Sequence, residues 1–129
     1  MLRERMNQAA LAMAAVVFAW VGVMGLFVPA AITAPVELVA PTASAHNEIR
    51  ANYGGMHLAV SALFVLGAVS AAFRWTATIV LTLVSSGLVA GRLVSFVVDG
   101  VPNLFVVQLL VTEATAAASG AALLWAAQE

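Results

Sequence analysis

The sequence contains no cysteine, which excludes disulfide bonds, thiolate metal sites, iron–sulfur clusters and cysteine nucleophiles. It also contains no lysine: its five basic residues are all arginine, against six acidic residues. The net charge of −1 leaves no basic patch to follow a phosphate backbone, so we expect no nucleic-acid partner. A zinc site needs about three or four protein ligands, and the few His, Asp and Glu residues suggest no such set, so we expect no metal.

Charge of either sign is scarce. Only 9% of the residues are charged and 64% are hydrophobic, and the mean hydropathy is +1.06. A typical soluble domain carries roughly 25% charged residues. A water-soluble protein of this size has too small an interior to hide so much apolar surface. The composition therefore indicates a protein whose solvent is lipid.

Four long apolar runs account for most of the chain. A transmembrane helix needs about 20 mainly apolar residues, and the four runs cover roughly residues 8–30, 49–72, 75–98 and 104–127. Three prolines interrupt the first connection, FRW (73–75) is expected to form a tight turn, and DGVPN (99–103) is a cluster of turn-forming residues. We therefore predict an all-α membrane protein in which a single domain, residues 1–129, forms an antiparallel four-helix bundle.

The arginines suggest an orientation. Arg3 and Arg5 precede the first helix, and Arg74 lies in the predicted FRW turn on the same side, whereas Arg50 stands alone on the other side. The positive-inside rule then predicts that both termini are cytoplasmic. The alternative is a signal peptide cleaved near ASA (43–45), but the apolar run exceeds the usual 7–15 residues and ASA lies well beyond it.

The second predicted helix begins with polar side chains on one face. At about 100° per residue, Arg50, Tyr53 and His57 fall within a face about 120° wide. His57 is about two turns into the helix, too deep for an ordinary loop residue. Each of these side chains is open to a plain packing role, but their shared face favours a binding site.

Other residues of this segment are predicted to be structural. Asn47 is expected to cap the second helix, and Glu48 to meet the positive N-terminal end of that helix. Gly54 and Gly55 are expected to let another helix approach closely.

The third and fourth helices carry charges within the membrane. Glu113 lies nine residues after Leu104, hence about 13 Å deep, where a charge costs about 2.5–3.5 kcal/mol on insertion scales. Arg92 on the neighbouring antiparallel helix is its predicted partner, and Asp99 is an alternative partner for Arg92. The residues assigned structural roles on this side are Gly91, which forms a GxxxG pattern with Gly87, Ser95 and Pro102.

All strongly polar intramembrane residues fall in the outer half of the predicted bundle or at its middle. We therefore predict one polar pocket open to the outer side, which holds a headgroup such as a lipid phosphate or a quinone carbonyl. Its predicted lining is Arg50, Tyr53, His57, Arg92, Asp99 and Glu113.

Three stretches carry a family resemblance: NEIRANYGGMHLAVSALFVLGA, then GLVAGRLVSFVVDGVP, then TEA. Together they resemble a family of small bacterial four-helix membrane proteins of unknown function. The resemblance implies a bacterial inner membrane and no established activity. In size and span number the chain is also loosely similar to DoxX-type membrane proteins, some of which associate with quinone-linked oxidoreductases. The resemblance singles out Glu48, Arg50, Tyr53, Gly54, Gly55, Gly91, Arg92, Ser95, Asp99, Gly100, Pro102 and Glu113.

Three function classes follow from these residues. Independent catalysis is the least supported, because no serine stands in a nucleophile motif and no catalytic residue is predicted. A stand-alone protein that binds or transports a lipid or quinone is the second. The favoured class is a small non-catalytic accessory or structural subunit of a larger membrane complex. The chain is expected to bind that complex or further copies of itself, and to hold a lipid or quinone among the surrounding membrane lipids. A subunit of a quinone-linked oxidoreductase is a variant of the same expectation.

Overall fold

Helices make up nearly all of the chain in the computed structural model, which describes residues 1–127. Within these residues there is no strand, and four helical stretches are long and apolar enough to cross a membrane. The predicted all-α bundle with four candidate spans is confirmed. In chain order the elements are α1 (Leu2–Phe27), α2 (Pro29–Thr33), the 3-10 turn η1 (Ala34–Val36), α3 (Ala43–Ile49), the π-helical η2 (Arg50–Met56), α4 (His57–Val69), α5 (Ala71–Val98) and α6 (Leu104–Ala126).

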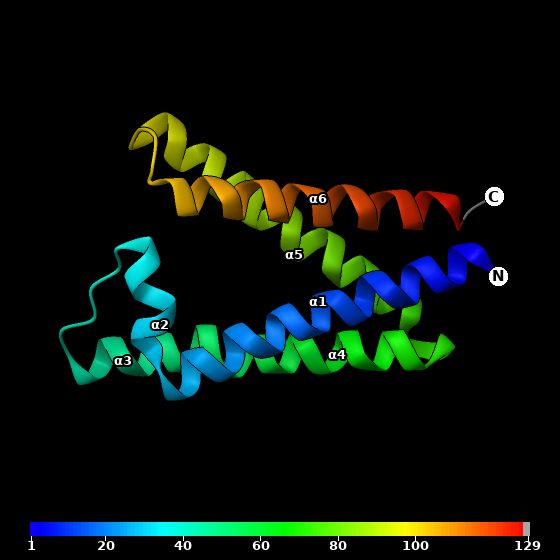
Figure 1. Cartoon of the computed structure of the whole chain (residues 1–129), viewed down its shortest axis with the longest axis horizontal. Helices are drawn as coiled ribbons and strands as arrows, with labels where there is room; N and C mark the ends of the chain where they lie inside the picture. The colour runs from blue at the N-terminus through cyan, green and yellow to red at the C-terminus, as the bar shows by residue number, and fades with distance from the viewer. Residues whose placement is uncertain (128–129) are drawn as a thin grey trace.

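The spans form two antiparallel pairs (Figure 1). One pair is α1 with η2 and α4, the other is α5 with α6, and α4 packs on α5 to join them. Leu11, Phe64 and Leu81, from three different spans, are buried in the shared core. α1 begins and α6 ends at one end of the bundle, which we call the terminal end. The opposite end, with η1 and the connection between α5 and α6, is the distal end.

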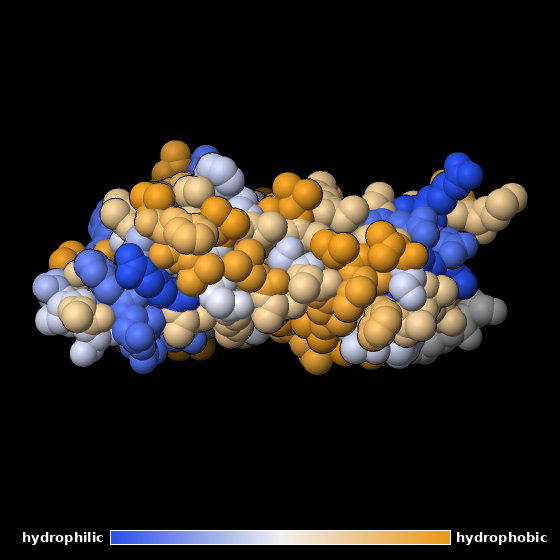
Figure 2. Space-filling model, turned by 90° about the horizontal axis from the view of Figure 1, so that it is seen from below, coloured by the Kyte–Doolittle hydropathy of each residue, from blue (hydrophilic) through white to orange (hydrophobic). Residues whose placement is uncertain are grey.

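The face of the molecule that Figure 2 shows is apolar around the middle of the bundle and polar toward both ends. Large apolar side chains such as Trp20 and Leu83 are well exposed. In water such exposure is unfavourable, whereas a bilayer is an apolar solvent and the helices satisfy their backbone hydrogen bonds internally. The chain is therefore a small multi-pass membrane protein.

Two helix starts differ from the prediction. The second span begins at Ala43, where the Thr42 hydroxyl accepts the N–H of Ala45 at 3.1 Å. The predicted cap Asn47 therefore lies inside α3, and its assignment as a cap is wrong. The predicted FRW turn is also wrong: the chain turns at Ser70, whose backbone is extended (φ −126°, ψ 126°), and residues 73–75 lie within α5. The start of the fourth span is correct, and Asn103 caps it by accepting the N–H of Val106 at 3.1 Å.

Three arginines bind carbonyl groups in the last turn of a helix other than their own. Arg50 Nε donates to Leu26 O of α1 at 3.0 Å, Arg74 Nε donates to Gly67 O of α4 at 3.2 Å, and Arg3 donates to Ala126 O of α6. The last four carbonyls of a helix have no partner within that helix, and such groups are costly in lipid. Each guanidinium therefore stabilises a helix end by binding one of these last carbonyls.

Glycines allow α1 and η2 to touch. A Cβ atom on Gly25 would lie 2.7 Å from the backbone carbon of Tyr53, and one on Gly54 would lie 2.6 Å from the Leu26 side chain. Both distances are too short for any larger residue. The predicted close-approach role of Gly54 is confirmed, whereas no other helix of this chain comes close to Gly55, where the nearest atom to a Cβ would be the Arg50 carbonyl oxygen at 4.0 Å.

The connection between α1 and α3 is fastened to the start of α6. Asn103 Nδ2 donates to Pro35 O and to Glu37 Oε1, each at 3.0 Å. Glu37 has a positive φ of 59°, so the chain changes direction at this residue. The segment that follows, Leu38–Ala40, which we call the strap, runs from this point toward α3 (Figure 1).

Candidate functional site

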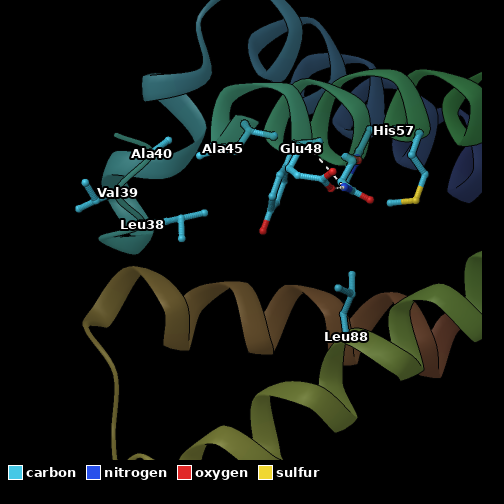
Figure 3. A pocket seen from close by; sticks show the side chains of 11 residues that line it. Leu38, Val39, Ala40, Ala45, Glu48, His57 and Leu88 are labelled. Carbon is cyan, nitrogen blue, oxygen red and sulfur yellow. Dashed lines mark hydrogen bonds between the residues drawn. The ribbon is translucent and has the colours of Figure 1, made fainter. Parts of the chain in front are cut away.

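A groove of about 490 Å³ lies at the distal end between the strap, the second span and α5 (Figure 3). The strap contributes apolar side chains, and Leu88 of α5 faces the second span across the groove. One wall, from α3 through η2 to the start of α4, carries the polar groups. The residues that line the groove are Leu38, Val39, Ala40, Ala45, Glu48, Ile49, Asn52, Tyr53, Met56, His57 and Leu88.

The polar wall is built on the π-helical segment η2. A π-helical turn holds more residues than an α-helical turn, and such turns occur frequently at functional sites. Gly54 is the buried residue of this segment and sits against α1, which fixes the opposite side of η2 toward the groove. The segment thus presents Asn52, Tyr53 and Met56 to the same space.

His57 is held in a stack of three rings. Its ring centroid lies 5.2 Å from that of Phe18 on α1 and 5.8 Å from that of Tyr53, with interplanar angles of 25° and 16°. Stacked aromatic pairs at such distances contribute roughly 0.5–1.5 kcal/mol beyond simple burial. The stack therefore fixes both Tyr53 and His57 where they enter the groove.

The hydrogen bond of His57 defines its tautomer. Nδ1 lies 2.8 Å from the Asn52 carbonyl oxygen. A carbonyl only accepts, so Nδ1 carries the proton and donates it. In the neutral ring Nε2 then has a free lone pair.

Glu48 lines the groove and is not placed as predicted. It lies near the end of α3 rather than in the first turn of a helix, so its assignment to a positive helix end is wrong. Asn52 Nδ2 donates to Glu48 Oε2 at 3.1 Å and to the Glu48 carbonyl at 3.0 Å. These two bonds use both amide hydrogens of Asn52 and hold the carboxylate at the groove (Figure 3).

The prediction of one pocket shared by Arg50 and Arg92 is wrong. Arg50 turns toward the end of α1, where it binds Leu26 O, and it is absent from the groove lining. Of the six predicted lining residues, the groove contains Tyr53 and His57.

The predicted pair of Arg92 and Glu113 is confirmed. Nε donates to Oε2 at 2.6 Å and Nη2 donates to Oε1 at 2.7 Å, a bidentate arrangement between α5 and α6. Both side chains are largely buried, with 22% and 14% of their areas exposed. Neither side chain of the pair is among the residues that line the groove.

The remaining predicted residues lie outside the groove. Asp99 accepts a hydrogen bond from Ser95 Oγ at 2.9 Å and makes no bond with Arg92, so the alternative pairing is wrong. Pro102 is half-buried in the connection before α6. A Cβ on Gly91 would meet nothing within 4 Å, so this glycine serves no close packing within the chain. In residues 1–127, no three His, Asp or Glu side chains form a group that could hold a metal ion.

Sequence reasoning missed Asn52, Leu88 and the strap as parts of the site. The spacing of Glu48 and Asn52, four residues apart, was a usable signal for their contact. Leu88 and the strap carried no signal, because they are ordinary apolar residues brought to the groove by the tertiary fold.

The comparisons with known proteins give a family and no activity. The family model described as "Domain of unknown function (DUF4345)" matches residues 6–127. No curated protein and no solved structure matches the chain.

Proposed function

We propose a function for this chain, which belongs to the DUF4345 family of unknown function: it binds the polar end of an amphipathic molecule, a lipid or quinone, in the distal groove. The observation that carries the proposal is the two-sided lining of that groove. Polar groups of Glu48, Asn52 and His57 lie along one wall, and Met56 and Leu88 add apolar surface. A ligand with a polar head and a hydrocarbon tail matches both.

Size and depth support the same ligand class. Pockets that hold small molecules usually have volumes of about 300–1,000 Å³, and this groove has about 490 Å³. Glu48 lies near the end of α3 and His57 at the start of α4, so the polar groups of the groove extend along the distal part of the second span. With the termini in the cytoplasm, as the arginine distribution suggests, the groove opens into the outer leaflet.

The experiment blocks the groove without touching its polar groups. Leu88→Trp places a large ring across the groove, whereas Leu83→Trp, on the same helix and more exposed, alters only the outer surface. The protein is reconstituted in nanodiscs of a total bacterial lipid extract supplemented with decylubiquinone, then released and weighed by native mass spectrometry. Adducts should persist in the wild type and in Leu83→Trp and be lost in Leu88→Trp. Equal adducts on all three proteins, or none on any, would overturn the proposal.

The second proposal is an accessory subunit within a larger membrane complex. Its support is the small size of the chain, 13.3 kDa, nearly all of it in candidate spans. A protein with so little surface outside the bilayer has little room for machinery of its own. Purification from native membranes in a mild detergent tests this role: a stable larger complex supports it, and a lone 13.3 kDa chain contradicts it.

A further inference from the structure

We propose that the groove selects a positively charged, hydrogen-donating head, an ammonium group on an apolar chain. This inference rests on the proposed binding function and names its ligand class. The charge of the lining is the first argument. Glu48 is the one carboxylate among the residues that line the groove, and no arginine is among them. The two nearby arginines are engaged elsewhere, Arg50 with Leu26 O and Arg92 with Glu113.

Hydrogen-bonding capacity is the second argument. Both amide hydrogens of Asn52 are used by Glu48, which leaves the Asn52 Oδ1 to accept. Oε1 of the Glu48 carboxylate also accepts, and in the neutral ring of His57 Nε2 does so too, because Nδ1 holds the proton. Tyr53 is the one side chain of the lining with a hydroxyl to donate. The groove therefore offers several acceptors and a single side-chain donor.

An alkylammonium is the complement of this set. It carries one positive charge and three donors, which match the carboxylate and the two neutral acceptors. The ring of Tyr53 adds attraction for a cation. A phosphate would face Glu48 with like charge, and a quinone carbonyl, which only accepts, would find only the Tyr53 hydroxyl. The hydrocarbon chain then lies against Met56, Leu88 and the strap.

Two sources offer this chemistry: the headgroup of an aminolipid and a free long-chain amine. Four probes with matched tails test the head: dodecylamine, dodecyltrimethylammonium, dodecanol and dodecyl phosphate, titrated calorimetrically into the detergent-solubilised protein. Dodecylamine should bind at least about ten-fold more tightly than dodecyl phosphate, because charge-assisted hydrogen bonds are the stronger ones. Dodecyltrimethylammonium, which has the charge without the donors, should fall between them. Nanodiscs of phosphatidylethanolamine, phosphatidylcholine or phosphatidylglycerol then identify a lipid source if the first retains adducts best.

Glu48→Gln is the diagnostic variant, since it keeps the shape and removes the charge. In this variant the ratio of the dissociation constants of dodecanol and dodecylamine should fall about ten-fold. Glu4→Gln is the matched control, because that carboxylate pairs with Arg74 near the terminal end, outside the lining, and its loss should leave the preference unchanged. If Glu48→Gln fails to fold, as judged by its melting curve, His57→Phe removes the Nε2 acceptor while keeping the ring stack and should also weaken dodecylamine.

The outcomes separate the two proposals. If dodecyl phosphate or dodecanol binds as tightly as dodecylamine or more tightly, the ammonium selectivity is overturned. If Leu88→Trp abolishes that binding, the binding function of the groove remains in place. Binding of none of the four probes by the wild type overturns the ammonium selectivity, and the adducts of the wild type and Leu88→Trp in nanodiscs then decide the binding function by themselves. Tight dodecylamine binding that survives Glu48→Gln unchanged overturns the assigned role of the carboxylate and with it this inference.

Discussion

Removing Glu113 should be among the most damaging single changes in this protein. Its carboxylate holds Arg92 through two hydrogen bonds of 2.6 and 2.7 Å. In Glu113→Ala both bonds disappear, and the guanidinium stays between α5 and α6 with 22% of its side chain exposed. The remaining charge then has neither a partner nor enough water to replace one.

Two independent estimates agree on the size of the effect. Breaking a buried ion pair by removing one partner costs about 3–5 kcal/mol. An unpaired arginine near the centre of a bilayer costs about 2.5–3.5 kcal/mol on insertion scales. We therefore expect Glu113→Ala to lower the free energy of unfolding by about 3–4 kcal/mol and the melting temperature by on the order of 10 °C.

A double-mutant cycle in detergent tests the reasoning. Arg92→Leu with Glu113→Leu should recover most of the loss, because two well-packed apolar residues replace the pair without leaving a charge. The matched control is Glu4→Ala: Glu4 is 57% exposed, and Arg74, although only 13% exposed, keeps the carbonyls of Gly67 and Ala68 as partners, so this change should cost clearly less than Glu113→Ala. A Glu113→Ala melting temperature equal to that of Glu4→Ala, or a double variant as unstable as the sum of the singles, would refute the coupling.

Two further predictions concern packing and topology. Gly25→Ala should destabilise the protein by roughly 1–3 kcal/mol, because the added carbon meets the backbone of η2 at 2.7 Å. In Gly91→Ala the added carbon meets nothing within 4 Å, so this variant should be neutral or stabilising. The melting temperatures of the two variants test this difference, and equal values would contradict it. Alkaline phosphatase fused in the DGVPN connection should be active and the same enzyme fused at the C-terminus inactive, and the reverse pattern would place the termini outside.

The four spans and the ion pair were predictable because they depend on strong local rules. Runs of about 20 apolar residues leave few alternatives to spanning helices, and the DGVPN turn forces α5 and α6 to be antiparallel neighbours. Once those two helices are adjacent, Arg92 and Glu113 are the charges within reach at similar depth. The cost of leaving either one alone in lipid makes their pairing the expected solution.

The helix ends were less predictable, because an arginine beside a membrane span has two possible roles: it can face the lipid headgroups or bind the end of a neighbouring helix. Arg74 was expected to mark an interfacial turn, yet it lies in the first turn of α5 and reaches back to the carbonyl of Gly67. Hydropathy does not distinguish an arginine that faces lipid headgroups from one that caps a neighbouring helix. The choice depends on which unpaired carbonyls the tertiary fold brings near.

The π-helical segment explains why the predicted polar face was only partly correct. A wheel with 100° per residue assumes an unbroken α-helix, but η2 contains wider turns, and each extra residue rotates the preceding positions by about 100°. Tyr53 and His57, four residues apart, still stack on each other. Earlier positions exchange faces: Glu48 enters the groove lining, and Arg50 turns to α1.

This rotation also decides the electrostatics of the site. With Arg50 in the groove beside Glu48, the two opposite charges would have neutralised each other. The Arg50 guanidinium instead donates to a backbone carbonyl at the end of α1. Glu48 is therefore the carboxylate of the lining, with no arginine beside it in the groove. Arg92 is neutralised in the same way by Glu113. The protein thus uses its arginines to stabilise helix ends and a buried contact, and the resulting groove has the electrostatic character of a cation site.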